Sequence, residues 1–138
     1  MSWLDLVDNT TELEKLYAGY VPSISGVHLV GVNLYHNNSF SVFGFSLPDF
    51  PPDPPEKWKS SEVNVVQLNM KLSGVFGFSM RGWEDSGFAD LQIARLDEGV
   101  RVTVESESIE LDVTANRARI NSFAGYIVNP EREKYRNC

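Results

Sequence analysis

One stretch of the chain alternates between apolar and polar residues, and this alternation limits the folds that are open to it. From Val100 to Asp112 the apolar side chains occupy one face and the polar side chains the other. Successive side chains of a β-strand point to opposite faces, so this pattern predicts a hairpin with a buried face and a solvated face. The apolar set is Val100, Val102, Val104, Ile109 and Leu111, and the polar set is Arg101, Thr103, Glu105, Glu110 and Asp112.

Similar strand-like segments cover most of the chain, and they are separated by short polar connections. Short connections favour antiparallel neighbours. We therefore predict a mainly β, β-rich α+β protein with about eight antiparallel strands in a mostly meander order. An open curved sheet and a closed barrel both satisfy the pattern. The predicted strands are Val27 to Tyr35, Phe40 to Leu47, Asn64 to Ser73, Val75 to Gly82, Ala89 to Leu96, Val100 to Ser106, Ile109 to Thr114 and Ala118 to Val128.

Three segments depart from the strand pattern. Residues 1–20 are predicted to be helical at the N-terminus, with one short helix from about Asp8 to Gly19. Residues 48–58 contain five prolines, which remove amide donors, so we expect a loop there that Trp58 caps. Residues 129–138 form a charged tail. At 138 residues, the chain is expected to be a single domain, 1–138.

The charge of the chain bears on its partners and its compartment. The net charge is −7, which argues against binding nucleic acid and favours a basic or neutral partner. We find no secretion signal and no apolar run long enough for a membrane span. The single cysteine, Cys138, fits a reducing compartment. We therefore expect a cytoplasmic protein that contacts no membrane.

No group of residues predicts a cofactor, a metal site or a catalytic site. His28 and His36 lie about 26 Å apart on an extended strand, too far to share a metal ion. The glycine-containing stretch after Ser73 lacks the lysine and the helix of a phosphate loop. Carboxylate pairs such as Glu105 and Glu107 are also what a solvated hairpin face produces. We therefore expect no enzyme activity.

Several short motifs, taken in order, resemble the immunity protein 50 family of bacterial polymorphic toxin systems. They are Trp3, Val21-Pro22-Ser23, Pro54-Pro55-Glu56-Lys57-Trp58, Asn64-Val65-Val66-Gln67-Leu68 and Gly82-Trp83. The resemblance runs from about Trp3 to Phe123. It implies a cytosolic antidote that binds a cognate toxin domain and protects the bacterium that produces it. The family offers no catalytic residues to carry over.

The sequence also indicates where such a partner would bind. We expect an acidic surface to face a basic toxin, most naturally a nuclease, with the protein itself a monomer or a weak dimer. Trp83 is the candidate anchor, because large aromatic side chains often dominate binding energy. The candidate contact residues are Trp83, Glu84, Asp85, Glu105, Glu107, Glu110 and Asp112.

Two other functions compete with this interpretation. An eight-stranded barrel can enclose a small molecule or a glycan. Its lining would then include Phe43, Phe45, Phe76 and Phe78, although the same side chains are enough to fill a core. An enzyme that uses the acidic pairs, such as a sugar hydrolase, is a third interpretation that lacks a clear acid-base partner.

Overall fold

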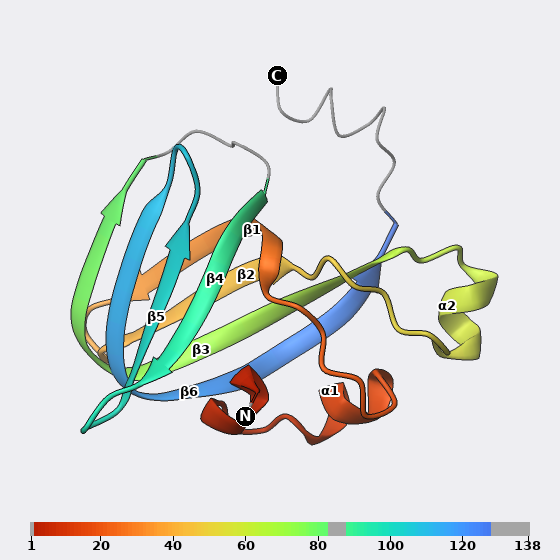
Figure 1. Cartoon of the computed structure of the whole chain (residues 1–138), viewed down its shortest axis with the longest axis horizontal. Helices are drawn as coiled ribbons and strands as arrows, with labels where there is room; N and C mark the ends of the chain where they lie inside the picture. The colour runs from red at the N-terminus through yellow and green to blue at the C-terminus, as the bar shows by residue number, and fades with distance from the viewer. Residues whose placement is uncertain (1, 83–87, 128–138) are drawn as a thin grey trace.

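In the computed structural model, which describes residues 2–82 and 88–127, the chain forms a barrel of six antiparallel strands (Figure 1). The strands follow one another around the barrel in the order β1-β2-β3-β6-β5-β4. Each half of the chain is a three-stranded meander, and the halves join where β3 pairs with β6 and where β4 meets β1. The strands are β1 (Ser25–Tyr35), β2 (Phe40–Ser46), β3 (Val65–Arg81), β4 (Phe88–Arg95), β5 (Val100–Glu105) and β6 (Glu110–Tyr126).

The mainly β prediction is confirmed, but the prediction of about eight strands was wrong. Two predicted breaks lie inside the long strands β3 and β6, which run side by side across the molecule in Figure 1. Gly74 has a φ of +66°, and the pairing register shifts between Val75 and Gly77. A glycine in this conformation bends a strand at a bulge without ending it. The connection predicted around Asn116 likewise lies within β6.

The prediction of a single helix was also wrong, because the described residues include two short helices and one 3-10 turn. The turn η1 (Trp3–Leu6) precedes α1 (Thr11–Leu16), and positive φ angles at Ala18 and Gly19 follow the end of α1. The second helix, α2 (Glu56–Ser60), lies in the segment predicted to be a loop. Its N-cap is Pro55, and a proline is tolerated where the first turn needs no amide donor. No helix in the described part of the chain has the length and apolar character to cross a membrane.

The core fills the inside of the barrel and extends beneath the N-terminal helix. On β3 every second side chain points into this core, and Val66, Leu68, Met70 and Leu72 are fully buried. Tyr17, which follows α1, is also fully buried, and its hydroxyl donates to the Asp49 carbonyl at 2.7 Å. Burial, with a smaller contribution from the Asp49 charge, raises the pKa of Tyr17 well above its ordinary value. The side chain therefore stays neutral and anchors the N-terminal segment to the proline-rich loop.

The segment before α1 lies beside β6 at the point where β5 stops pairing with it. The pairing of β5 with β6 ends at Ala115. Further along, the Asp8 amide donates to the Ala118 carbonyl at 2.8 Å, and the Ile120 amide donates to the Asp8 carbonyl at 3.0 Å. The N-terminal segment thus continues the hydrogen bonding of the sheet along β6, and η1 lies against β4.

Candidate binding surface

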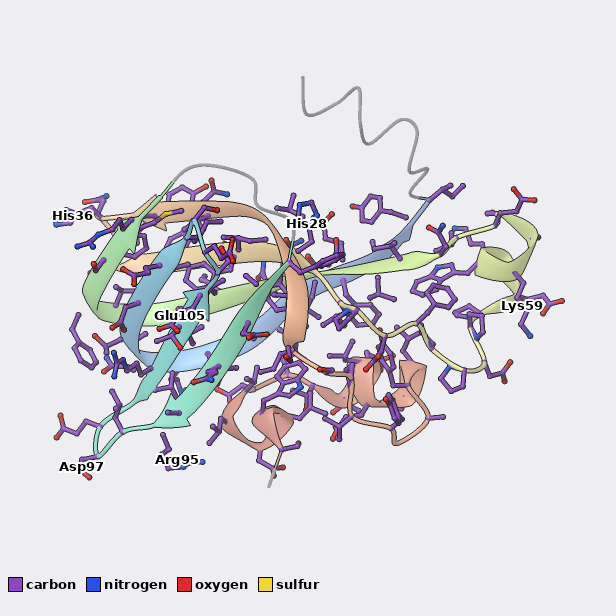
Figure 2. All side chains as sticks on the ribbon, turned by 45° about the horizontal axis from the view of Figure 1, so that its top comes forward. His28, His36, Lys59, Arg95, Asp97 and Glu105 are labelled. Carbon is purple, nitrogen blue, oxygen red and sulfur yellow. The ribbon has the colours of Figure 1, made fainter. Side chains whose placement is uncertain are left out.

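Three carboxylates form a row across the outer face of the barrel. Asp90 on β4 pairs with Glu105 on β5, and Glu105 pairs with Glu110 on β6. All three residues are exposed, and Figure 2 labels Glu105 within this part of the barrel. Like charges directly opposite one another on neighbouring strands destabilise a sheet. This row, which we call the acidic row, therefore brings like charges together, although Asp90 and Glu110 each also have a favourable partner.

The carboxylates of this face differ in whether a basic side chain forms an ion pair with them. Arg81 Nη1 lies 3.8 Å from Glu110 Oε2, a loose pair between exposed side chains. For Glu105 and Glu107, the described part of the chain provides no ion pair. Glu107 lies in the exposed turn between β5 and β6, close in sequence to the end of the row. The carboxylates that are most available to a partner are therefore Glu105 and Glu107, followed by Glu110.

Asp112, by contrast, already has a partner within the chain. Arg101 Nε donates to Asp112 Oδ1 at 3.0 Å, and Arg101 Nη2 donates to Asp112 Oδ2. The hydrogen bonds from this guanidinium hold the pKa of Asp112 below its usual range, although burial acts in the opposite direction. The two-point pair neutralises the charge of Asp112, so this predicted contact residue offers less to a partner than its neighbours do.

Asp90 belongs to the acidic row and was not among the predicted residues. Its Oδ1 accepts hydrogen bonds from the Ser25 hydroxyl at 2.8 Å and from the Gly26 amide at 3.1 Å. These bonds join β4 to β1 where the barrel closes. The polar position of Asp90 between Ala89 and Leu91 is visible in the sequence, but its place opposite Glu105 depends on the strand register.

An exposed aromatic side chain lies next to this face. Phe88, the first residue of β4, is 73% exposed and pairs with His28 on β1. Large exposed aromatic residues beside polar groups are common at the centres of protein interfaces. Sequence reasoning placed the aromatic anchor at Trp83. Trp83, Glu84 and Asp85 lie outside the described residues, as does the charged tail 129–138.

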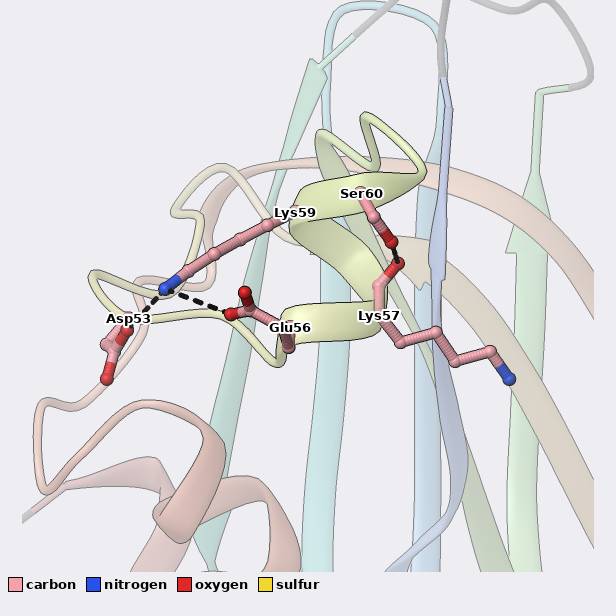
Figure 3. A network of polar contacts seen from close by, with 5 residues as sticks. All are labelled: Asp53, Glu56, Lys57, Lys59 and Ser60. Atoms are coloured by element: carbon pink, nitrogen blue, oxygen red, sulfur yellow. Dashed lines mark hydrogen bonds and ion pairs between the residues drawn. The ribbon is translucent and has the colours of Figure 1, made fainter.

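A second surface feature is a groove between α1 and the proline-rich loop. Its volume is about 570 Å³. Lys59 Nζ lies 3.1 Å from Asp53 Oδ1 and 3.8 Å from Glu56 Oε2, so the charges on this rim pair with one another (Figure 3). The groove is lined by Glu12, Lys15, Leu16, Asp53, Pro54, Pro55, Glu56, Trp58, Lys59 and Phe123.

The phenylalanines considered as a ligand lining have different environments. Phe43 and Phe45 are fully buried in the core, and Phe78 is partly buried against it. Phe76 lies in the β3 bulge and is 60% exposed. These four side chains therefore do not surround one common cavity.

The two histidines lie at separate places on the first hairpin. Figure 2 shows His28 where β1 meets β4 and His36 at the far end of β1. Within residues 2–82 and 88–127, no group of three or more histidine, cysteine, aspartate or glutamate side chains is placed to hold a metal ion. Trp58, expected to cap the proline-rich loop, lies in α2, packs against the core and has its ring centroid 6.2 Å from that of Phe50.

Comparison with known proteins gives one match. A family model described as Immunity protein 50 matches residues 9–126, from just before α1 to the end of β6. No curated protein and no solved structure matches the chain.

Proposed function

Because the match spans most of its length, the chain belongs to the immunity protein 50 family, and we propose that it binds and neutralises a cognate toxin domain in the cytoplasm of the bacterium that produces both. The family name indicates an immunity protein of a toxin system. Such a protein acts by occupying a surface of the toxin, and this role requires no catalytic residues of its own.

The acidic row is the observation that supports this proposal most strongly. Asp90, Glu105 and Glu110 lie opposite one another on three adjacent strands. Repulsion between neighbouring carboxylates carries a cost in stability, which the hydrogen bonds of Asp90 and the ion pair of Glu110 with Arg81 offset in part. A basic partner would remove that cost on binding. Residues that oppose folding but favour association are expected at functional sites.

The charge of the row indicates the chemistry of the toxin. With a net charge of −7, the protein attracts basic surfaces over the range of the Debye length, about 8 Å at physiological salt. A nuclease must present basic groups to bind a phosphate backbone. We therefore propose a nuclease toxin whose basic surface meets Glu105, Glu107 and Glu110. Electrostatic steering would also speed the encounter, which helps an antidote act before the toxin does.

The remaining predicted contacts keep a secondary place in the proposal. Trp83, Glu84 and Asp85 are proposed to extend the contact surface, because they follow β3 and precede β4 in the chain. Asp112 is proposed to position Arg101 rather than to meet the toxin directly, since its two carboxylate oxygens accept hydrogen bonds from that side chain.

The proposal is tested by expressing the toxin domain encoded beside this protein in bacteria, with and without the protein. We expect cells with both proteins to grow, and the two to co-purify as a one-to-one complex. Growth arrest despite a well-expressed immunity protein, with no complex on a sizing column, would refute the proposal. A toxin domain inactivated at its active site is the control, because it should still bind while no longer arresting growth.

A further inference from the structure

Within the six strands, acidic side chains are confined to one side of the barrel. The strands β1, β2 and β3 contain no aspartate or glutamate, and β6 contains none after Asp112. The acidic row lies on β4, β5 and the start of β6. Around the barrel, β2 is three places from β5, and β3 is three places from β4 (Figure 1). The strands without carboxylates therefore lie across the barrel from the acidic row.

Three basic side chains gather on the side without carboxylates. Lys71 on β3 pairs directly with Arg119 on β6, and Arg117 lies two residues before Arg119. The residues on either side of Lys71 and of Arg119 are buried, so both charged side chains point away from the core. We call Lys71, Arg117 and Arg119 the basic patch. The barrel thus carries opposite charges on opposite sides.

The basic patch is only partly neutralised within the chain. Arg117 Nε lies 3.6 Å from Asp8 Oδ2, a loose pair between exposed side chains. Within residues 2–82 and 88–127, no carboxylate forms an ion pair with Lys71 or Arg119. Like charges directly opposite one another on neighbouring strands repel. Carboxylates from another molecule would therefore be favourable beside Lys71 and Arg119.

Aromatic side chains extend the basic patch onto β2 and β1. Lys71 Nζ lies 4.4 Å from the centroid of the Phe40 ring, a cation–π contact that leaves the charge of the lysine in place. The Tyr35 ring stacks on that of Phe40 with 4.5 Å between centroids, and Tyr35 is 48% exposed. Aromatic residues and arginine are enriched at protein interfaces. The composition of this surface therefore favours a protein partner.

We propose that the basic patch binds the acidic row of a second copy of this protein, so that copies associate head to tail. Each copy carries both complementary surfaces, and contact between them reduces the repulsion within each surface. Such a contact joins two different surfaces, so it repeats from copy to copy. The net charge of −7 opposes association, but physiological salt screens exposed charges beyond about 8 Å, so the charges at the contact dominate.

This association has a consequence for the toxin. The contact covers Glu105 and Glu110, which are also proposed to meet the toxin domain. A second copy and the toxin domain therefore compete for the acidic row, and an excess of toxin domain should disperse the associated copies into one-to-one complexes. The competition rests on the proposed function, whereas the self-association does not.

Sedimentation of the full chain without any toxin tests the self-association. In about 0.1 M salt, we expect the weight-average mass to rise from that of one chain at about 10 μM protein to about twice that value near 1 mM. In about 0.5 M salt, we expect the mass of one chain throughout. A mass of one chain at every concentration and both salt levels would overturn the inference. If such a single chain instead bound an oligonucleotide through the basic patch, the partner would be a polyanion and the inference would also be wrong.

A charge swap tests which surfaces meet. One variant carries Lys71→Glu and Arg119→Glu, and the other carries Glu105→Lys and Glu110→Lys. Each variant alone should sediment as one chain, because its two surfaces have the same sign of charge. An equal mixture should associate again, because each reversed surface finds its complement on the other variant.

The matched control for the charge swap is Lys15→Glu with Lys57→Glu, which reverses two exposed cations on α1 and α2. This control should associate as the wild type does, and all three variants should keep the circular dichroism spectrum of the wild type. If the wild type associates but the mixture of swapped variants does not, copies meet through other surfaces and the inference is refuted. That result would leave the proposed neutralisation of a toxin standing.

Discussion

Glu105 on β5 lies directly opposite Glu110 on β6, so two carboxylates are cross-strand neighbours. On its other side Glu105 lies opposite Asp90, so one carboxylate has a like-charged neighbour on each adjacent strand. Cross-strand pairs contribute roughly 0.2–1 kcal/mol each, with a sign set by their charges. Repulsion within the acidic row acts against the stability of this face, although the charge of Arg101 attracts that of Glu105 and offsets part of it. The remaining cost is consistent with a role in binding.

Removing the central charge should therefore stabilise the protein and weaken its function. We expect Glu105→Gln to raise the free energy of unfolding by about 0.2–1 kcal/mol in urea denaturation. The same variant should bind the toxin domain more weakly in calorimetry. Glu98→Gln, in the exposed turn between β4 and β5, is the control and should change neither quantity. A loss of stability in Glu105→Gln would show that the attraction between Glu105 and Arg101 outweighs the repulsion from Asp90 and Glu110.

Asp90 should be needed for closing the barrel. Its Oδ1 accepts hydrogen bonds from the Ser25 hydroxyl and the Gly26 amide. Asp90→Ala removes both bonds, and we expect a loss of about 1–2 kcal/mol in the free energy of unfolding. Asp90→Asn keeps an oxygen acceptor and should lose less. Asp97→Ala, at the exposed β4–β5 turn, should be neutral; if it is as destabilising as Asp90→Ala, the assignment is wrong.

The Arg101–Asp112 pair should make stability depend on acid pH. The pKa of Asp112 is lowered in the folded state, so its contribution is present at neutral pH. That contribution is lost as the pH falls below the ordinary aspartate value of 3.8 and through the lower folded pKa. Because both side chains are largely exposed, the contribution is small. Urea denaturation of wild type and Asp112→Asn at neutral pH and near pH 3 should show a difference that shrinks in acid, whereas a constant difference would contradict the pairing.

Gly99 should tolerate no side chain. Its φ is +94°, and an added Cβ would collide with the Ala115 carbonyl oxygen on β6. We expect Gly99→Ala to lower the free energy of unfolding by about 1–3 kcal/mol. Gly31→Ala is the matched control, since a Cβ there meets no atom within 4 Å and the backbone φ is not in the left-handed region. If thermal unfolding shows equal stability for the two variants, this account of the β4–β5 turn fails.

Much of the fold could be predicted from the sequence, because residue alternation reports directly which face of a strand is buried. The hairpin of β1 and β2 and the strands β4 and β5 are confirmed. Alternation does not distinguish a turn from a bulge, since both use glycine, so the pattern on either side of Gly74 predicts two strands where the structure has one. The helix α2 was missed because its prolines, including Pro55 at the N-cap, lie before the helical turn rather than within it.

The candidate surface was only partly predictable for a related reason. The carboxylates Glu105 and Glu110 come from adjacent strands of one hairpin, so their proximity follows from the local pattern. Asp90 joins them through the register of β4 against β5, which no local pattern specifies. The neutralisation of Asp112 by Arg101 likewise depends on which residues face each other across β5 and β6. The contact roles of Trp83, Glu84 and Asp85 stay predictions.

The most direct test of the central claim is the affinity for the toxin domain of two variants with equal charge changes. The first reverses Glu105, Glu107 and Glu110 to lysine, and the second reverses the exposed residues Glu62, Asp97 and Glu98 to lysine. Calorimetry at about 0.05 and 0.3 M salt measures how much of the affinity comes from attraction between exposed charges, because salt screens that attraction. We predict that the first variant loses at least about 100-fold in affinity and most of its salt dependence, while the second binds nearly as the wild type does. Equal affinities and equal salt dependence in the two folded variants would contradict the claim that this face of the barrel binds the toxin.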